Sequence, residues 1–91
     1  MAVSYNVASS STPTIITQSA EGPSGYGKRA YVSALVANSA AVYIGGDSGV
    51  ATTTGFEMAA GEEREFVLVG SEDLYVVSAA AQNVRVLLTG V

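Results

Sequence analysis

The fold is decided by residues 41–68, AVYIGGDSGVATTTGFEMAAGEEREFVL. This stretch reads as two strands joined by a crossover that is rich in glycine and threonine. Gly45 and Gly46 are predicted to end the first strand, because paired glycines reach positive φ at low steric cost. The short piece at residues 55–58 is predicted to pin the crossover onto the core.

Alternation within the two strands indicates which side chains share a face. Val42 and Ile44 share one face of the first strand, and Phe66 and Leu68 share one face of the second. The opposite face of the second strand carries Glu65, Val67 and Val69.

Three more segments have the composition of strands, at residues 14–19, 74–78 and 84–89. The last of them alternates clearly. Its apolar face consists of Val84, Val86 and Leu88, and its other face of Arg85, Leu87 and Thr89.

Residues 28–38, KRAYVSALVAN, fit two patterns. A helical stripe would consist of Tyr31, Val32, Leu35 and Val36. The β-branched and aromatic content, and the lack of an N-cap after Gly27, favour a strand that is buried on both sides. Asn38 and Ser39 are then predicted to form a tight turn, which joins this strand to residues 41–44 as a hairpin.

Residues 1–13 are predicted to be an N-terminal arm and residues 14–91 the folded domain. The arm is hydroxyl-rich and has too little apolar content to become ordered alone. Val3, Tyr5 and Val7 alternate, so the arm could become a strand against a neighbour; a frayed terminus fits as well. The chain is therefore predicted to be all-β, a small antiparallel β-sandwich or barrel of six to seven strands with an extended N-terminal arm.

Composition points to contacts with other chains. A chain of 91 residues buries only about 60–65% of its unfolded surface, so its core is thin. Yet 48% of the residues are apolar and only 13% are charged, where about 25% charged is usual. Contact with copies of the chain, or with a large partner, would cover this apolar surplus.

Charge and missing residue types exclude several classes of function. A net charge of −4 with four Lys and Arg gives no basic patch for a phosphate backbone, so no nucleic-acid partner is expected. No run approaches the about 20 apolar residues of a membrane span, so no membrane partner is expected either. The sequence has no Cys and no His, which removes thiolate chemistry and the commonest general base and metal ligand.

One segment matches a nucleotide-binding spacing. GPSGYGK at residues 22–28 fits the pattern G-x-x-x-x-G-K. However, Arg29 stands where the motif needs a Ser or Thr for magnesium, and Pro23 removes an N–H from the loop. The next segment also favours a strand over the helix that would face a phosphate. An ordinary loop is the better interpretation, and no cofactor is expected.

The acidic residues lack the arrangement of a catalytic or metal site. A glycosidase needs two carboxylates across a cleft, whereas the pairs Glu62-Glu63 and Glu72-Asp73 lie beside predicted turns, where charge is normally solvated. Asp47 could join the second pair in a weak calcium site, but no metal-ligand spacing supports it. We therefore predict no catalytic residue, no metal site and no enzymatic activity.

Residues 41–88 resemble a small β-module of virion structural proteins in tailed bacteriophages. The matching pieces are, in order, VYIGG at 42–46, GFEM at 55–58, AAGE at 59–62, FVLV at 66–69, LY at 74–75 and VRVL at 84–87. The likeness covers about half of the chain, and the N-terminal half does not share it. It implies a non-enzymatic virion component such as a capsid decoration (cementing) protein. The alternative is a tail, fibre or head–tail accessory module that binds a virion partner or a host-surface glycan.

The partners that this resemblance implies are the major capsid protein or another virion protein. It places the chain on the capsid surface, after assembly in the host cytoplasm, as a homo-oligomer for which a trimer is favoured. The contacts would be made by the arm, by the loop at residues 20–27 and by the two cations after that loop. Tyr5 in the arm and Tyr26 in the loop are candidates because Tyr is enriched at binding hot spots. The candidate interface residues are Val3, Tyr5, Val7, Tyr26, Lys28 and Arg29.

Overall fold

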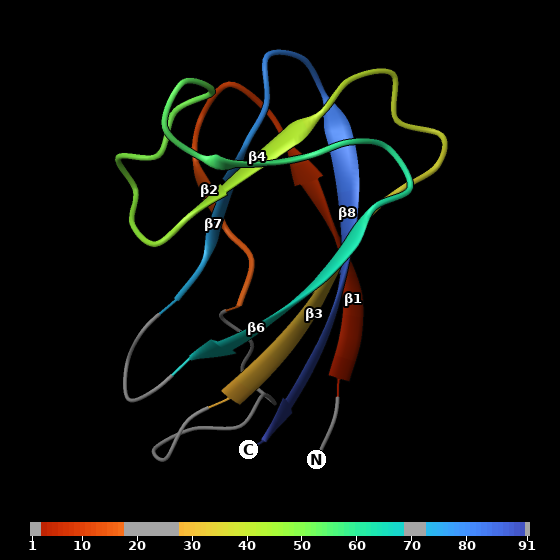
Figure 1. Ribbon diagram of the computed structural model, residues 1–91, viewed down its shortest axis with the longest axis vertical. Helices are drawn as coiled ribbons and strands as arrows, with labels where there is room; N and C mark the ends of the chain where they lie inside the picture. The colour runs from red at the N-terminus through yellow and green to blue at the C-terminus, as the bar shows by residue number, and fades with distance from the viewer. Residues whose placement is uncertain (1–2, 18–27, 69–72, 91) are drawn as a thin grey trace.

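Eight strands form two antiparallel sheets in the computed structural model, which describes residues 3–17, 28–68 and 73–90 without the side chains of Val3 and Lys28. In chain order the strands are β1 (Val3–Ser9), β2 (Thr14–Ile15), β3 (Lys28–Ala34), β4 (Val42–Gly45), β5 (Phe56–Met58), β6 (Glu63–Leu68), β7 (Tyr75–Val77) and β8 (Gln82–Gly90). Sheet A has the order β1-β8-β3-β6 and sheet B the order β2-β7-β4-β5 (Figure 1). The predicted all-β sandwich is confirmed, with eight strands in place of six to seven.

The strand pairs are nested within one another along the chain. β1 pairs with β8, β2 with β7, β3 with β6, and β4 with β5. The chain therefore follows the path of one long hairpin, closed between β4 and β5 and wrapped into two layers. In addition, β3 pairs with β8 and β4 pairs with β7, and these two pairings complete the four-stranded sheets. This arrangement is that of a jelly-roll sandwich.

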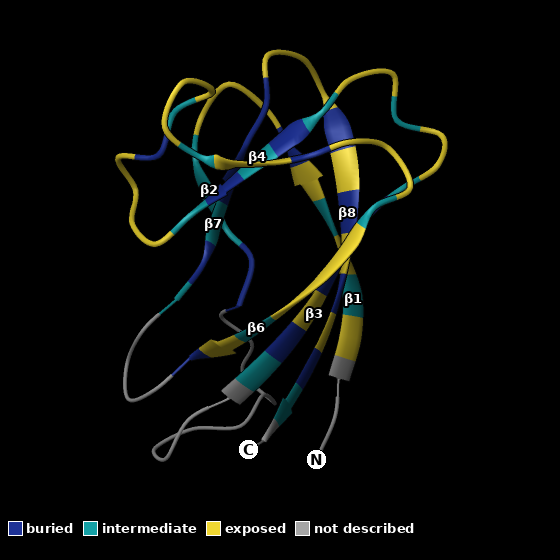
Figure 2. Cartoon of the chain, in the orientation of Figure 1, coloured by how far each residue is buried: buried dark blue, intermediate teal, exposed yellow. Residues whose placement is uncertain are grey.

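The core lies between the sheets and takes every second residue of the strands. Figure 2 shows buried and exposed residues alternating along β8. The buried cluster consists of Ile16, Ala30, Val32, Ala34, Val42, Ile44, Met58, Leu68, Leu74, Val76, Val84, Val86 and Leu88. The residues predicted to share one face of residues 41–44, and the apolar face predicted for residues 84–89, belong to this cluster, as does Leu68, against which Phe66 is partly buried.

Residues 28–34 form a strand at the centre of sheet A, as predicted in preference to a helix. The hairpin predicted after this strand is wrong. β3 pairs with β6 on one side and β8 on the other, whereas β4 lies in sheet B. The connection is instead held to β8, because Asn38 Nδ2 donates to the Asn83 carbonyl (2.9 Å) and Asn83 N–H donates to Asn38 Oδ1 (3.0 Å). Both edges of β3 are paired within sheet A, by β6 and β8, so neither edge is left for β4.

The segment predicted as an arm is a strand of the domain itself. β1 pairs with β8 over its whole length, from Val3 opposite Leu88 to Ser9 opposite Gln82. The expected boundary between arm and domain at residue 13 is corrected accordingly: β1 extends the chain's own sheet rather than a neighbour's. Ser9 Oγ also lies 2.7 Å from Ser78 Oγ, in a buried contact that joins the end of β1 to the segment after β7.

Gly45 serves a different purpose from the one predicted. Among the described residues only Gly61 has a positive φ, at 86°, so Gly45 and Gly46 do not end β4 through left-handed backbone. A Cβ at Gly45 would lie 2.4 Å from the Cβ of Val50, whereas one at Gly46 would meet nothing within 4 Å. Gly45 is therefore required because the loop that follows β4 folds back against it.

We expect Leu88→Ala to lower the free energy of unfolding by about 3 kcal/mol, because it leaves a cavity in the core. Leu88 is 0% exposed and its neighbour Leu87, on the opposite face, is 40% exposed. Leu87→Ala is the matched control and should cost about 1 kcal/mol or less. Urea unfolding followed by circular dichroism measures both; equal losses would contradict the assigned faces.

Gly45→Ala should destabilise the fold by about 1–3 kcal/mol, since its methyl group overlaps Val50. Gly46→Ala should change the free energy of unfolding by no more than about 0.5 kcal/mol. Thermal unfolding of the two variants side by side tests the close approach, and a loss at Gly46 that matched the loss at Gly45 would refute it.

Candidate interaction surface

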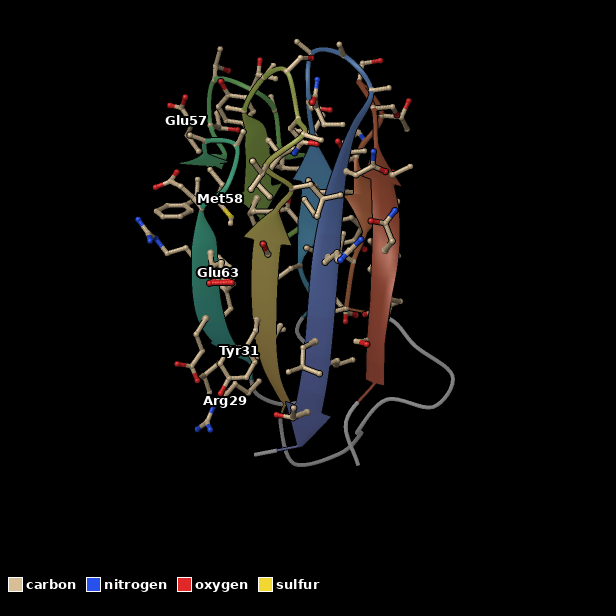
Figure 3. The ribbon with its side chains drawn as sticks, turned by 90° about the vertical axis from the view of Figure 1, so that its right-hand side faces the viewer. Arg29, Tyr31, Glu57, Met58 and Glu63 are labelled. Atoms are coloured by element: carbon tan, nitrogen blue, oxygen red, sulfur yellow. The ribbon has the colours of Figure 1, made fainter. Side chains whose placement is uncertain are left out.

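The outer face of sheet A, which points away from sheet B, is built by the residues that alternate with the core. Strand register arranges them in rows across the sheet. One row runs Ser4, Leu87, Tyr31, Glu65 from β1 to β6, and the next runs Asn6, Arg85, Ser33, Glu63. Figure 3 shows these four strands side by side and labels Arg29, Tyr31 and Glu63 on the half formed by β3 and β6.

Large apolar side chains lie exposed on this face, two of them at its centre. Tyr31 and Leu87 are register partners and each is 40% exposed, and Val67 on β6 is 55% exposed. A shallow hollow of about 430 Å³ covers the same region and is lined in part by Ser4, Tyr31, Ser33, Glu63, Arg85 and Leu87. A face with an apolar centre and a polar border has the anatomy of a protein–protein contact surface.

The charges on this face are of both signs. Arg29 Nε lies 2.7 Å from Glu65 Oε2, in an ion pair whose N–H does not point at the oxygen as a hydrogen bond requires. Arg85 and Glu63 lie in one row with Ser33 between them, and neither side chain forms an ion pair within the described part of the chain. The face thus presents one unpaired cation on β8 and one unpaired anion on β6.

A second cluster closes the side of the sandwich where β5 and β6 lie. The rings of Phe56 and Phe66 meet edge to face, with centroids 6.2 Å apart and an interplanar angle of 86°. The guanidinium carbon of Arg64 lies over the Phe56 ring, 5.7 Å from its centroid, and Arg64 Nη2 lies 3.6 Å from Glu62 Oε2. Such contacts stabilise a sheet edge, so we assign this cluster a structural role.

Of the six interface residues predicted from the sequence, Arg29 lies on this face, and the others lie elsewhere or have side chains outside the described residues. Tyr5 and Val7 are half-buried and pack against the core. Val3 and Lys28 belong to β1 and β3, but their side chains lie outside the description, as does all of Tyr26. Arg29 is the predicted residue that the structure places beside the outer face of sheet A, where it pairs with Glu65. The interface role of these six residues stays a prediction.

Sequence reasoning missed the residues that make up this outer face. Alternation did place Arg85 and Leu87 on one side of their strand, and Glu65 and Val67 on one side of theirs. It did not reveal that β3 lies between these two strands and contributes Tyr31 to the same face. The missing signal was therefore the partner of each strand.

The hydroxyl of Tyr5 ties β1 to the chain after β2. It donates to the carbonyl of Ile16 at 2.5 Å. Thr17 Oγ1 donates to Asp73 Oδ1 at 2.7 Å and accepts from Leu74 N–H at 2.9 Å. Burial raises the pKa of the Tyr5 hydroxyl above its ordinary value of 10.0, and the charge of Asp73 raises it further. This network fastens the edge strand of sheet A to the other layer.

The remaining predicted chemistry gains no site in the described residues. No group of three or more Asp or Glu side chains that could hold a metal ion occurs there, and Glu72 of the proposed calcium site is not described. Of the GPSGYGK segment only Lys28 is described, at the start of β3. The described part of the chain also contains no helix long and apolar enough to span a membrane.

Comparisons with known proteins identify the fold without naming a family. No protein-family model and no curated protein matches the chain. One solved structure is similar: a chain of Bacillus endospore appendages, which are described as forming a novel family of disulfide-linked pili. The similarity covers 100% of this chain and 86% of that chain, with a TM-score of 0.63 and 17% sequence identity. At this identity the likeness establishes the sandwich fold.

Tyr5→Phe should lower the free energy of unfolding by about 1 kcal/mol at neutral pH, because it removes the hydrogen bond to Ile16. It should also remove part of the alkaline loss of stability. The folded state holds the Tyr5 proton more tightly than the unfolded state, so this contribution is complete below about pH 10 and is lost as the pH rises through the raised pKa.

Urea unfolding between about pH 8 and 11 measures this effect across the ordinary Tyr pKa. Tyr31→Phe, on the exposed outer face, is the control and should keep the wild-type pH dependence. If Tyr5→Phe kept it as well, the Tyr5 hydroxyl would not be the group responsible.

Proposed function

We propose that this chain is a non-enzymatic structural protein of a bacteriophage virion, a capsid decoration protein that stabilises the shell through contacts between many copies. The observation that supports it most directly is the outer face of sheet A, where exposed Tyr31 and Leu87 are surrounded by charges of both signs. Such a face suits binding to other protein surfaces. The resemblance of residues 41–88 to a virion module supplies the kind of assembly.

The fold is compatible with this function. Jelly-roll sandwiches are common in viral capsid proteins, although a shared fold is only an analogy for function. The net charge of −4 also favours a position on the outer surface of a shell, away from packaged DNA. The major capsid protein or another virion protein would be the partner there.

A second candidate is a subunit of a fibre, either a tail-fibre module or a pilus-like appendage. The structural likeness to the endospore appendages over the whole chain favours it. Those pili are described as disulfide-linked, whereas these 91 residues contain no Cys. A fibre built from this chain would therefore need non-covalent contacts between its subunits.

The test of the proposal uses virions of the phage that encodes the chain, prepared with and without the gene. We expect electron cryomicroscopy to place the chain on the outer shell, and shells that lack it to break at lower temperature. Adding the purified chain back should restore their survival, and the unrelated protein albumin is the control.

Localisation at the tail, or binding of the isolated chain to a glycan array, would favour the fibre module instead. Unchanged heat survival together with no binding to virions would overturn both virion roles. Fibres formed by the purified chain alone would support the pilus-like candidate.

A further inference from the structure

The outer face of sheet A carries a pattern that complements itself. Leu87 and Tyr31 lie side by side at its centre, and both are exposed. In the next row the unpaired cation Arg85 and the unpaired anion Glu63 lie on opposite sides of Ser33. We propose that this face binds the same face of a second copy of the chain, around a two-fold axis that runs parallel to β3 and β8 above the seam between them.

The charges support this arrangement. A two-fold axis along the strands turns one face over, so that its β8 side lies above the β3 and β6 side of the other copy. Arg85 then lies above Ser33 of the second copy, and its sideways offset from Glu63 of that copy is one strand spacing of about 4.8 Å, which the long side chains can bridge. The symmetry repeats the contact in the opposite sense, which gives two ion pairs between the copies.

The apolar centre matches under the same operation. Leu87 of each copy lies above Tyr31 of the other, because β8 and β3 exchange places across the axis and the two residues share a row. Four side chains, each now 40% exposed, would then be covered together. Asn6, in the row of Arg85, lies above Glu63 of the second copy and extends the polar border.

The size of the face sets the strength of the pair. Four strands at about 4.8 Å and seven residues at about 3.3 Å each span roughly 19 by 23 Å, or about 440 Å² per copy. The total of about 900 Å² falls below the 1,200 Å² or so of stable complexes. The pair should therefore be weak in dilute solution and fully formed only where copies are concentrated.

This inference rests on the proposed function in that a multi-copy assembly would supply such concentrations. It gives two-fold pairing through this face, in contrast to the trimer expected from the sequence. The edges β1 and β6 and the whole of sheet B stay available for a virion partner.

Charge reversal separates contacts between copies from contacts within one chain. Arg85→Glu should place a second carboxylate beside Glu63 of the other copy, and Glu63→Arg should place two cations together. Each variant alone should associate about tenfold more weakly than the wild type. A mixture of the two variants should regain association. Each mixed pair brings opposite charges together at both contacts across the interface, where either variant alone brings like charges together, whereas mixing cannot restore a contact within one chain.

Sedimentation velocity of the intact chain between about 10 µM and 1 mM covers the range expected for a weak interface. Glu57→Arg, an exposed charge on sheet B, is the matched control and should associate like the wild type. Both variants on the outer face of sheet A stay net negative, so the recovery on mixing would not arise from opposite overall charges.

A wild-type chain that stays monomeric over this range, or variants that do not complement each other, would overturn the pairing. Binding of such a monomer to virions would leave the proposed function standing. Pairing and complementation without any binding to virions would leave the pairing standing and overturn the virion role.

Discussion

The register between β3 and β8 is the constraint on which the structure depends. It places Ala30 opposite Leu88, Val32 opposite Val86 and Ala34 opposite Val84, and all six side chains are at most 1% exposed. Since side chains alternate along a strand, the same register places Tyr31 beside Leu87 on the other side of the sheet. A slip by one residue would expose the core and bury the outer face, so the core and the candidate interaction surface cannot be changed independently.

The nested pairing explains why residues 41–68 decide the fold. They contain β4 and β5, the innermost pair, and the start of the return path through β6. The turn between β4 and β5 can close because Gly45 lets Val50 approach its backbone. Each later strand then adds beside one that precedes the turn, until β8 meets β1. The first strand of the chain thus receives its partner last along the sequence.

Local pattern predicted the faces of the strands and failed on their neighbours. Alternation identified the inward residues of β8 correctly, because a period of two depends only on the strand itself. The hairpin predicted after β3 is wrong, since a turn-like sequence at Asn38 does not reveal that both edges of β3 pair with strands much later in the chain. For the same reason the sequence predicts an arm where β1 lies: the partner of β1 is at the other end of the sequence, and no local signal reports it. The candidate surface was out of reach on the same grounds, because Tyr31, Leu87 and Glu63 come from three strands that only the strand order brings together.

Pairing through the outer face of sheet A would also act on the stability of the fold. The central ladder of β3 and β8 has its core on one side and solvent on the other. A second copy laid over the exposed side would place this sheet between two protein layers. Because only the folded chain presents the two rows in register, association would stabilise the folded state by mass action, more strongly as copies become concentrated. A small domain with a thin core would then gain its full stability within the assembly that it helps to build.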